Sequence, residues 1–189
     1  QVLTMIAVAT CFECVGSILW GAYRYRLGNL PLYVPAGHGI FFLLAVRVAD
    51  LPWLALHRRL VVGGVFAGSL LLVARGLFLL PTLDLLGAAT WLLFVAFLFR
   101  GQRPLFYAVS FTVTMALEFY GTSFGIWAWA PMLPYVGLSA GNPPAGIGAG
   151  YCAMDSVAHR LAPSVEKLWL GLSSLRAKSP MRSVRSSES

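Results

Sequence analysis

The stretch Leu60–Leu80, LVVGGVFAGSLLLVARGLFLL, decides the fold class of this chain. It carries one charged side chain, that of Arg75, and it is long enough to cross a membrane, because a transmembrane helix needs about 20 mostly apolar residues. Outward from it, the same criterion predicts five further spans: Val2–Ala22, Ala36–Leu51, Leu83–Phe99, Leu105–Phe124 and Pro144–Leu161. The sequence therefore predicts an all-α integral membrane protein of about six transmembrane helices, with residues 1–162 as one transmembrane domain.

The composition points to the same class. Hydrophobic residues make up 58% of the 189 residues and charged residues 11%, whereas soluble domains average about 25% charged residues. So few polar side chains cannot cover a water-facing surface, which excludes a soluble globular enzyme and a disordered chain. Three cysteines, Cys11, Cys14 and Cys152, are too few for a disulfide scaffold. The net charge of +7 is spread between apolar runs, a pattern that orients a membrane protein and does not indicate a nucleic-acid partner.

The positions of Lys and Arg predict the orientation. Ten of them lie on one side of the predicted spans, and two, Arg24 and Arg26, lie on the other. Because cytoplasmic loops carry the excess of Lys and Arg, we expect both termini in the cytoplasm of a bacterial-type inner or plasma membrane. Residues 163–178 are predicted as an interfacial amphipathic helix and residues 179–189 as a disordered basic, Ser-rich tail. The first span carries Glu13 and no basic segment before it, unlike a signal peptide, and since the first residue is not Met we expect further residues upstream.

A four-part pattern occurs twice, around the first two spans and around the last two. It reads E-x-x-G, then aromatic-x-aromatic, then Asn, then P-A-G-x-G, and the two copies run from Glu13 to Gly39 and from Glu118 to Gly148. The second copy starts four spans after the first, so spans 1 and 5 run in the same direction. The pattern therefore predicts a parallel repeat, in which an axis along the membrane normal relates spans 1–2 to spans 5–6. Repeats of this kind usually place a functional site at their interface.

Several ionisable side chains fall inside or at the ends of the predicted spans. At the centre of a bilayer such a group costs at least ~2.5–3.5 kcal/mol, so it marks a functional site by default. If the repeat folds as a pair, Glu13 and Glu118 face each other across its axis, and His38 and Arg75 are expected to join them. Paired carboxylates in low dielectric divide into a proton donor and a base, so Glu13, Glu118 and Asp155 are the candidate catalytic residues. The alternative is a buried Glu–Arg network that holds the spans together.

The aromatic residues of both copies lie in predicted extracytoplasmic loops. Tyr and Trp at this depth either anchor a protein at the membrane interface or, in this chain, form the roof of a lipid-shaped pocket. Under the second reading they bind substrate together with His38 and Arg75; the residues concerned are Tyr23, Tyr25, Trp127, Trp129 and Asn142.

Neither a metal nor an organic cofactor is expected. Cys11 and Cys14 form C-x-x-C on an apolar helix, but no second cysteine pair or nearby His completes a zinc site. Asp155 and His159, spaced i, i+4, either bond to each other or place Asp155 in a pocket. The motifs of nucleotide-binding and triad-hydrolase enzymes are absent from the sequence.

The first copy resembles a known family. Its run Glu13-x-x-Gly16, Gly21-x-Tyr23-x-Tyr25 and Leu30-Pro31-Leu32-x-Val34-Pro35 resembles the membrane-embedded carotenoid hydratases of the carotenoid-biosynthesis family. The second copy, Gly125-Ile-Trp127-Ala-Trp129 with Gly141-Asn142-Pro143, is similar to loops of integral-membrane lycopene cyclases. The chain departs from these patterns at His38 and after Pro144, where Ala145 and Gly146 replace the paired Glu of the cyclases. The resemblance implies protonation of a polyene by buried carboxylates, with Glu13 and Glu118 as acid and base.

These features lead to one main hypothesis and two alternatives. The main hypothesis is a membrane enzyme that hydrates, cyclises or isomerises a C=C bond of a long apolar isoprenoid or carotenoid. Its expected partners are membrane lipid, the isoprenoid-type ligand, and partner subunits or further copies of the chain. The alternatives are a non-catalytic subunit of a larger membrane complex and a small transporter.

Overall fold

The computed structural model describes residues 1–178 of the chain, which are mostly helical, as the sequence predicts. The elements are, in chain order, α1 (Val2–Glu13), the π-helical η1 (Cys14–Leu19), β1 (Tyr23–Tyr25), α2 (Tyr33–Ala49), α3 (Pro52–Leu56), α4 (Arg58–Phe78), α5 (Leu85–Arg100), α6 (Pro104–Ser123), β2 (Trp127–Trp129) and α7 (Gly148–Lys178). The tail that we predict to be disordered, residues 179–189, lies outside the described residues.

Two helical segments of the described chain are long and apolar enough to cross a membrane. They are the continuous run of α1 and η1, Val2–Leu19, and α4, Arg58–Phe78. Helices α2 and α5 are also apolar but shorter. By length and composition alone, this is weak support for six spans, because a core helix or an N-terminal signal sequence passes the same test.

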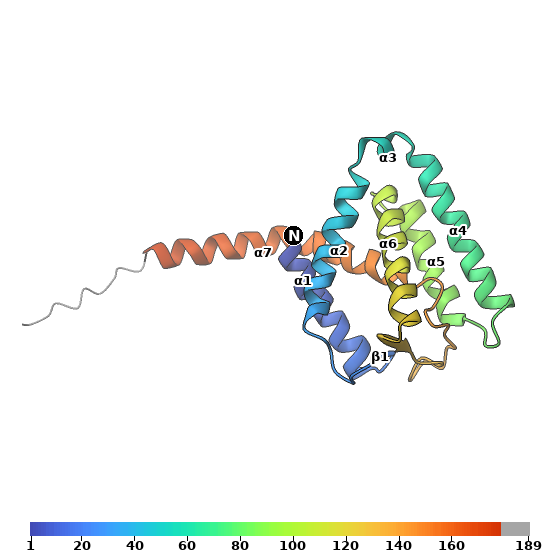
Figure 1. Cartoon of the computed structure of the whole chain (residues 1–189). Coiled ribbons are helices and arrows are strands. Elements are labelled where there is room, and N and C mark those ends of the chain that lie inside the picture. Colours follow the sequence, from blue (N-terminus) through green and yellow to red (C-terminus); the bar gives the residue numbers. More distant parts are fainter. Residues whose placement is uncertain (179–189) are drawn as a thin grey trace, which may run out of the picture.

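The helices form a ring with a pair beside it (Figure 1). Helix α1 packs against α2 and α7, and α6 packs against the same two helices, which closes the ring. Helices α4 and α5 pack together on α6, and α5 also contacts α7. One part of the ring's interior is an apolar cluster, with Met5, Phe42, Phe106 and Ala158 among its buried residues. A second cluster joins α5, α6 and α7, where the rings of Phe94 and Phe111 stack with centroids 3.9 Å apart.

A small β-ladder covers one end of the ring. Strands β1 and β2 pair antiparallel, with Tyr23 opposite Trp129 and Tyr25 opposite Trp127. The all-helical expectation did not include these strands, because three residues are too short for an alternating pattern to show in the sequence. The ladder joins the two aromatic-x-aromatic segments of the sequence pattern, although about a hundred residues separate them.

The end of the chain differs from the expectation of a span followed by a separate helix at residues 163–178. Helix α7 is continuous from Gly148 to Lys178 and contains Pro163. A proline inside a helix removes one hydrogen bond and crowds the preceding turn without always ending the helix. Figure 1 shows α7 running across the direction of α4, α5 and α6, with its C-terminal part projecting beyond the bundle.

Asp84 anchors the long connection between β2 and α7. It caps α5 by accepting a hydrogen bond from the Gly87 amide at 2.9 Å. The same carboxylate accepts bonds from the amides of Gly141 at 2.8 Å and Ala145 at 2.7 Å. One buried acidic side chain therefore fixes both the start of α5 and the segment that leads into α7.

Candidate functional site

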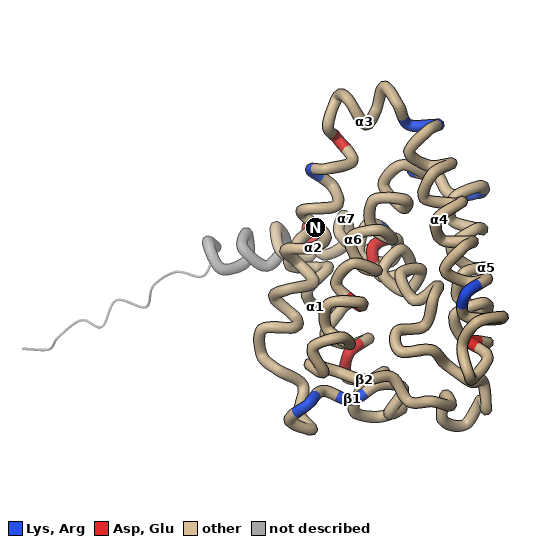
Figure 2. Tube along the Cα trace, turned by 45° about the vertical axis from the view of Figure 1, so that its right-hand side comes forward, with Lys and Arg blue, Asp and Glu red and all other residues tan. Residues whose placement is uncertain are grey.

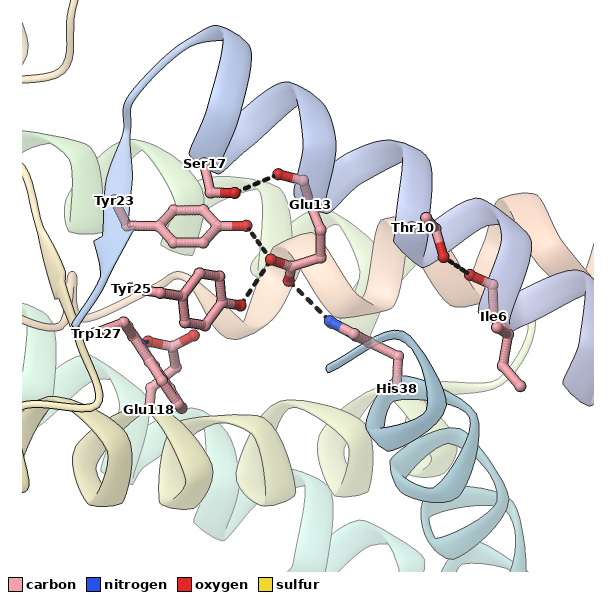
Figure 3. Close-up of polar contacts among 9 residues, drawn as sticks. All are labelled: Ile6, Thr10, Glu13, Ser17, Tyr23, Tyr25, His38, Glu118 and Trp127. Atoms are coloured by element: carbon pink, nitrogen blue, oxygen red, sulfur yellow. Dashed lines mark hydrogen bonds and ion pairs between the residues drawn. The ribbon is translucent and has the colours of Figure 1, made fainter. Parts of the chain in front are cut away.

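Glu13 lies at the end of α1 and is the centre of a hydrogen-bonded cluster (Figure 3). The hydroxyls of Tyr23 and Tyr25 donate to its Oε2 atom at 2.8 and 2.7 Å. Nε2 of His38, in the first turns of α2, lies 2.8 Å from Oε1 and forms an ion pair when the imidazole is protonated. The Glu13 carboxylate therefore ties together α1, β1 and α2, with both of its oxygens engaged.

Glu118 is the centre of a matching cluster on α6. The indole N–H groups of Trp127 and Trp129 both donate to its Oε2 atom at 3.0 Å. Glu118 is as buried as Glu13, since each is 6% exposed. Within residues 1–178, Oε1 of Glu118 accepts no hydrogen bond, so this carboxyl keeps one oxygen free.

The β-ladder brings the two clusters into one aromatic layer. The rings of Tyr23 and Trp129 lie 4.7 Å apart between centroids, and those of Tyr25 and Trp127 lie 6.0 Å apart. In Figure 3, Glu13 reaches this layer from α1 and Glu118 reaches it from α6 on the other side. The structure thus brings together the two glutamates and the four aromatic residues that the sequence pattern singles out.

The glycine of each E-x-x-G motif makes room for one of these rings. A Cβ atom on Gly16 would lie 2.9 Å from the Tyr23 ring, and one on Gly121 would lie 2.0 Å from the Trp127 ring. Glu and Gly three residues apart lie on the same face of a helix. The ring that packs on the glycine, that of Tyr23 or Trp127, therefore directs its O–H or N–H donor toward the glutamate. The turns into the strands also match, because Gly21 and Gly125 both have positive φ, at 71° and 61°.

Burial and the negative charge of Glu13 raise the pKa of Tyr23 and of Tyr25 well above the usual value of 10.0. Both hydroxyls therefore stay protonated at any physiological pH. They act as fixed hydrogen-bond donors to Glu13, whose negative charge they stabilise.

His38 belongs to the Glu13 cluster and has a further neighbour on α7. The ring of Tyr151 stacks on the imidazole, with centroids 4.8 Å apart and planes inclined by 25°. The Nδ1 atom of His38 is buried and has no hydrogen-bond partner among the described residues. Sequence reasoning missed Tyr151, although it lies one helical turn before Asp155 on the same helix face, which was the signal that could have identified it.

Asp155 is buried but lies outside the hydrogen-bonded glutamate clusters. Ser110 of α6 donates to its Oδ2 atom at 2.8 Å, and Oδ1 has no partner among the described residues. Of the two arrangements considered for Asp155 and His159, the structure has the second: Asp155 lines a pocket, and its bond goes to Ser110 and not to His159. Ser110 was also missed, because an isolated serine on an apolar helix gives no sequence signal.

The structure corrects the expectation that Arg75 joins the glutamates. Arg75 is exposed on α4, whose buried residues are Ser69, Val73 and Gly76. These three share one helix face, and Arg75 lies off it. The one ion pair in the described part of the chain joins Glu13 to His38, so a Glu–Arg network is not what holds these helices together.

Asn142 supports the aromatic layer from the side. Its Oδ1 atom accepts a hydrogen bond from the backbone amide of Trp129 at 3.0 Å, while the residue itself is exposed. Asn142 thus positions β2 and makes no direct contact with either carboxylate through a hydrogen bond.

Residues 1–178 contain no group of three or more His, Cys, Asp and Glu side chains arranged to hold a metal ion. The side chains that the described site brings together are two carboxylates, one imidazole, two phenols and two indoles. Cys11 and Cys14 are free thiols, and Cys11 is exposed.

Comparison of the chain with family models, curated proteins and solved structures finds no match. The resemblance to carotenoid hydratases and lycopene cyclases stays a prediction that depends on the motif residues.

Proposed function

We propose that this chain is a membrane-embedded enzyme that performs acid–base chemistry on a long apolar isoprenoid or carotenoid at Glu13 and Glu118. The observation that carries the proposal is the pair of buried carboxylates, each bonded by two aromatic donors of one shared layer. Buried, unequally bonded carboxylates are the arrangement that divides into a proton donor and a base.

The proposed membrane location has two supports beyond the length of α1 and α4. Large apolar side chains are exposed on many of the helices, among them Leu71, Phe78, Leu92, Phe99 and Phe119. A soluble monomer rarely exposes apolar surface on this scale. The proposed spans are α1 with η1, α2, α4, α5, α6 and, strongly inclined to these, the part of α7 that lies within the bundle, with both termini cytoplasmic.

The proposed orientation agrees with the distribution of charge. Figure 2 shows Lys and Arg gathered toward the end of the bundle that carries α3, with a smaller group beside β1. The positive-inside rule then places the α3 end in the cytoplasm and the β-ladder on the opposite side.

The parallel repeat is supported by contacts that occur twice. Glu13 and Glu118 each accept bonds from both aromatic residues of their own copy. A Cβ atom on Gly39 would contact Ile6, which lies seven residues before Glu13. A Cβ atom on Gly148 would contact Phe111, which lies seven residues before Glu118. In the ladder, Arg24 pairs with Ala128, the middle residues of the two segments, as a two-fold axis between the strands requires.

The two halves differ at one position, and this difference suggests the division of roles. His38 in the first P-A-G-x-G corresponds to Ile147 in the second, so only Glu13 has an imidazole partner. Glu118, with its free oxygen, is the proposed proton donor to a C=C bond, which leaves a carbocation on the substrate. Glu13 with His38 is the proposed acceptor of the proton that the carbocation, or a water that adds to it, then loses. The aromatic rings stabilise the cation through their π faces.

The test is an analysis of the lipids that copurify with the chain and its variants in mild detergent. Glu118→Gln and Glu13→Gln keep the size of each side chain and remove the transferable proton. We expect the wild type to convert a bound polyene or isoprenoid that both variants hold unchanged. Glu166→Gln, at an exposed position of α7, is the matched control and is expected to behave as the wild type. Conversion by both cluster variants at the wild-type rate would refute the proposal.

A second candidate function is a non-catalytic subunit of a membrane complex. One observation favours it: both carboxylate oxygens of Glu13 already accept hydrogen bonds. These three bonds join α1, β1 and α2, as expected of a residue that stabilises the fold. Under this alternative no apolar ligand is found, and stoichiometric partner subunits stay bound in both glutamine variants.

A further inference from the structure

A pocket of about 410 Å³ opens at the turn between α5 and α6, away from the aromatic layer. Its walls come from α2, α5, α6 and α7, so it lies where four helices of the bundle meet. Ligand pockets commonly have volumes of about 300–1,000 Å³. The volume is therefore sufficient for a head group and the start of an attached chain.

The outer wall of this pocket is basic. Arg100, Arg103, Arg160 and His159 line it, from α5, the α5–α6 turn and α7. None of the three arginines forms an ion pair within residues 1–178, and all three are exposed. Arg103 lies over the Phe106 ring, with its guanidinium carbon 4.8 Å from the centroid, which holds one of these charges at the pocket. Unpaired guanidinium groups that converge on one pocket are suited to a phosphate group.

The lining of the pocket also includes aromatic side chains and one buried polar atom without a partner among the described residues. Phe42 and Phe106, which are buried, and Phe97, which is half-buried, line the same pocket as the exposed arginines, so the lining combines charged and aromatic side chains. Asp155 lies among these residues, is 2% exposed, and has one oxygen that lacks a partner in the described chain. A buried acceptor without a donor is costly, and a hydroxyl of a bound ligand or a water supplies one.

We propose that this pocket binds a phosphate group attached to an apolar chain, as in an anionic lipid or a lipid phosphate. The arginines bind the phosphate and the phenylalanines cover the first part of the chain. The pocket is separate from the Glu13 and Glu118 clusters, and the proposal holds whether or not those residues are catalytic. In the proposed orientation this pocket lies toward the cytoplasmic side, where basic pockets between transmembrane helices bind lipid head groups.

The test measures lipid binding to the full chain by native mass spectrometry in a non-ionic detergent, with phosphatidic acid and phosphatidylcholine as the probes. We expect wild-type protein to retain phosphatidic acid at least tenfold more strongly than phosphatidylcholine. The double variant R100Q/R160Q is expected to lose this preference. R58Q/R59Q removes the same charge from α4, outside the pocket, and is expected to keep it.

Two further measurements test whether the lipid occupies the pocket itself and whether the site recognises the phosphate group alone. Ala96→Phe fills the pocket without changing charge and is expected to lower retention of phosphatidic acid at least tenfold. If inorganic phosphate alone displaces the lipid, the site recognises the phosphate group. If it does not, while R100Q/R160Q still loses the lipid, the site needs the attached chain. Equal losses in R100Q/R160Q and R58Q/R59Q, or equal retention of the two lipids, would overturn the proposal.

Discussion

At the scale of single residues, the glycines of the two E-x-x-G motifs decide whether the aromatic donors reach the glutamates. We expect Gly121→Ala to destabilise the protein by about 1–3 kcal/mol, because the new methyl group displaces the Trp127 ring from Glu118. Gly16→Ala is expected to cost less, since its methyl group would lie 2.9 Å from the Tyr23 ring, against 2.0 Å in the other case. Thermal unfolding in detergent, followed by tryptophan fluorescence, measures both effects.

The control for these variants is Gly64→Ala on α4, where a Cβ atom meets nothing within 4 Å. Alanine is a better helix former than glycine by about 1 kcal/mol, so this variant is expected to be neutral or slightly stabilising. If Gly121→Ala were as stable as Gly64→Ala, the close approach of Trp127 to α6 would not be a property of the folded protein.

The repeated sequence pattern singled out the four residues of the aromatic layer, because both copies contain the same aromatic-x-aromatic motif. The same patterns grouped Arg75 with the glutamates, which is wrong, since hydropathy gives the depth of a residue in a span but not the helix face it occupies. Ser110 was missed because an isolated serine on an apolar helix carries no pattern, and Tyr151 because its i, i+4 spacing to Asp155 was not used.

At the scale of elements, Asp84 holds the connection from β2 to α7 against the start of α5. We expect Asp84→Ala to destabilise the protein by about 2–4 kcal/mol, because it removes a helix cap and leaves the buried amides of Gly141 and Ala145 without an acceptor. Limited proteolysis is expected to cut within residues 131–141 of this variant first. Asp50→Ala, at the exposed end of α2, is the control and should leave the cleavage pattern unchanged.

The element boundaries show which parts of the fold the sequence alone predicts. The apolar runs predicted α1 with η1, α2, α4, α5 and α6 to within a few residues, since burial and lipid exposure both require long apolar segments. The strands were missed because their pairing is set by two distant segments meeting at the end of the bundle. The continuity of α7 through Pro163 was missed because a proline usually, but not always, ends a helix.

At the scale of the whole molecule, the proposed arrangement in a bilayer makes the two ends of the bundle chemically distinct. Arg24 lies in β1 and Arg26 follows it, whereas Arg58 and Arg59 begin α4, directly after α3. One proposed span, α2, lies between the two pairs and places them on opposite sides of the membrane. A soluble arrangement, in contrast, leaves both pairs and the apolar outer face of α4 accessible to water.

Cysteine labelling in intact cells distinguishes these arrangements. In a chain with Cys11 and Cys14 replaced by alanine, Arg26→Cys is expected to react with a membrane-impermeant maleimide, and Arg59→Cys only after the cells are opened. Leu71, on α4, is 71% exposed, and Leu71→Cys is expected to resist the reagent in both cases because lipid covers it. Buried Cys152 stays in place as an internal control for folding. If Leu71→Cys were labelled before detergent is added, α4 would not span the membrane. If Arg26→Cys and Arg59→Cys were labelled from the same side, the number of spans between them would not be odd.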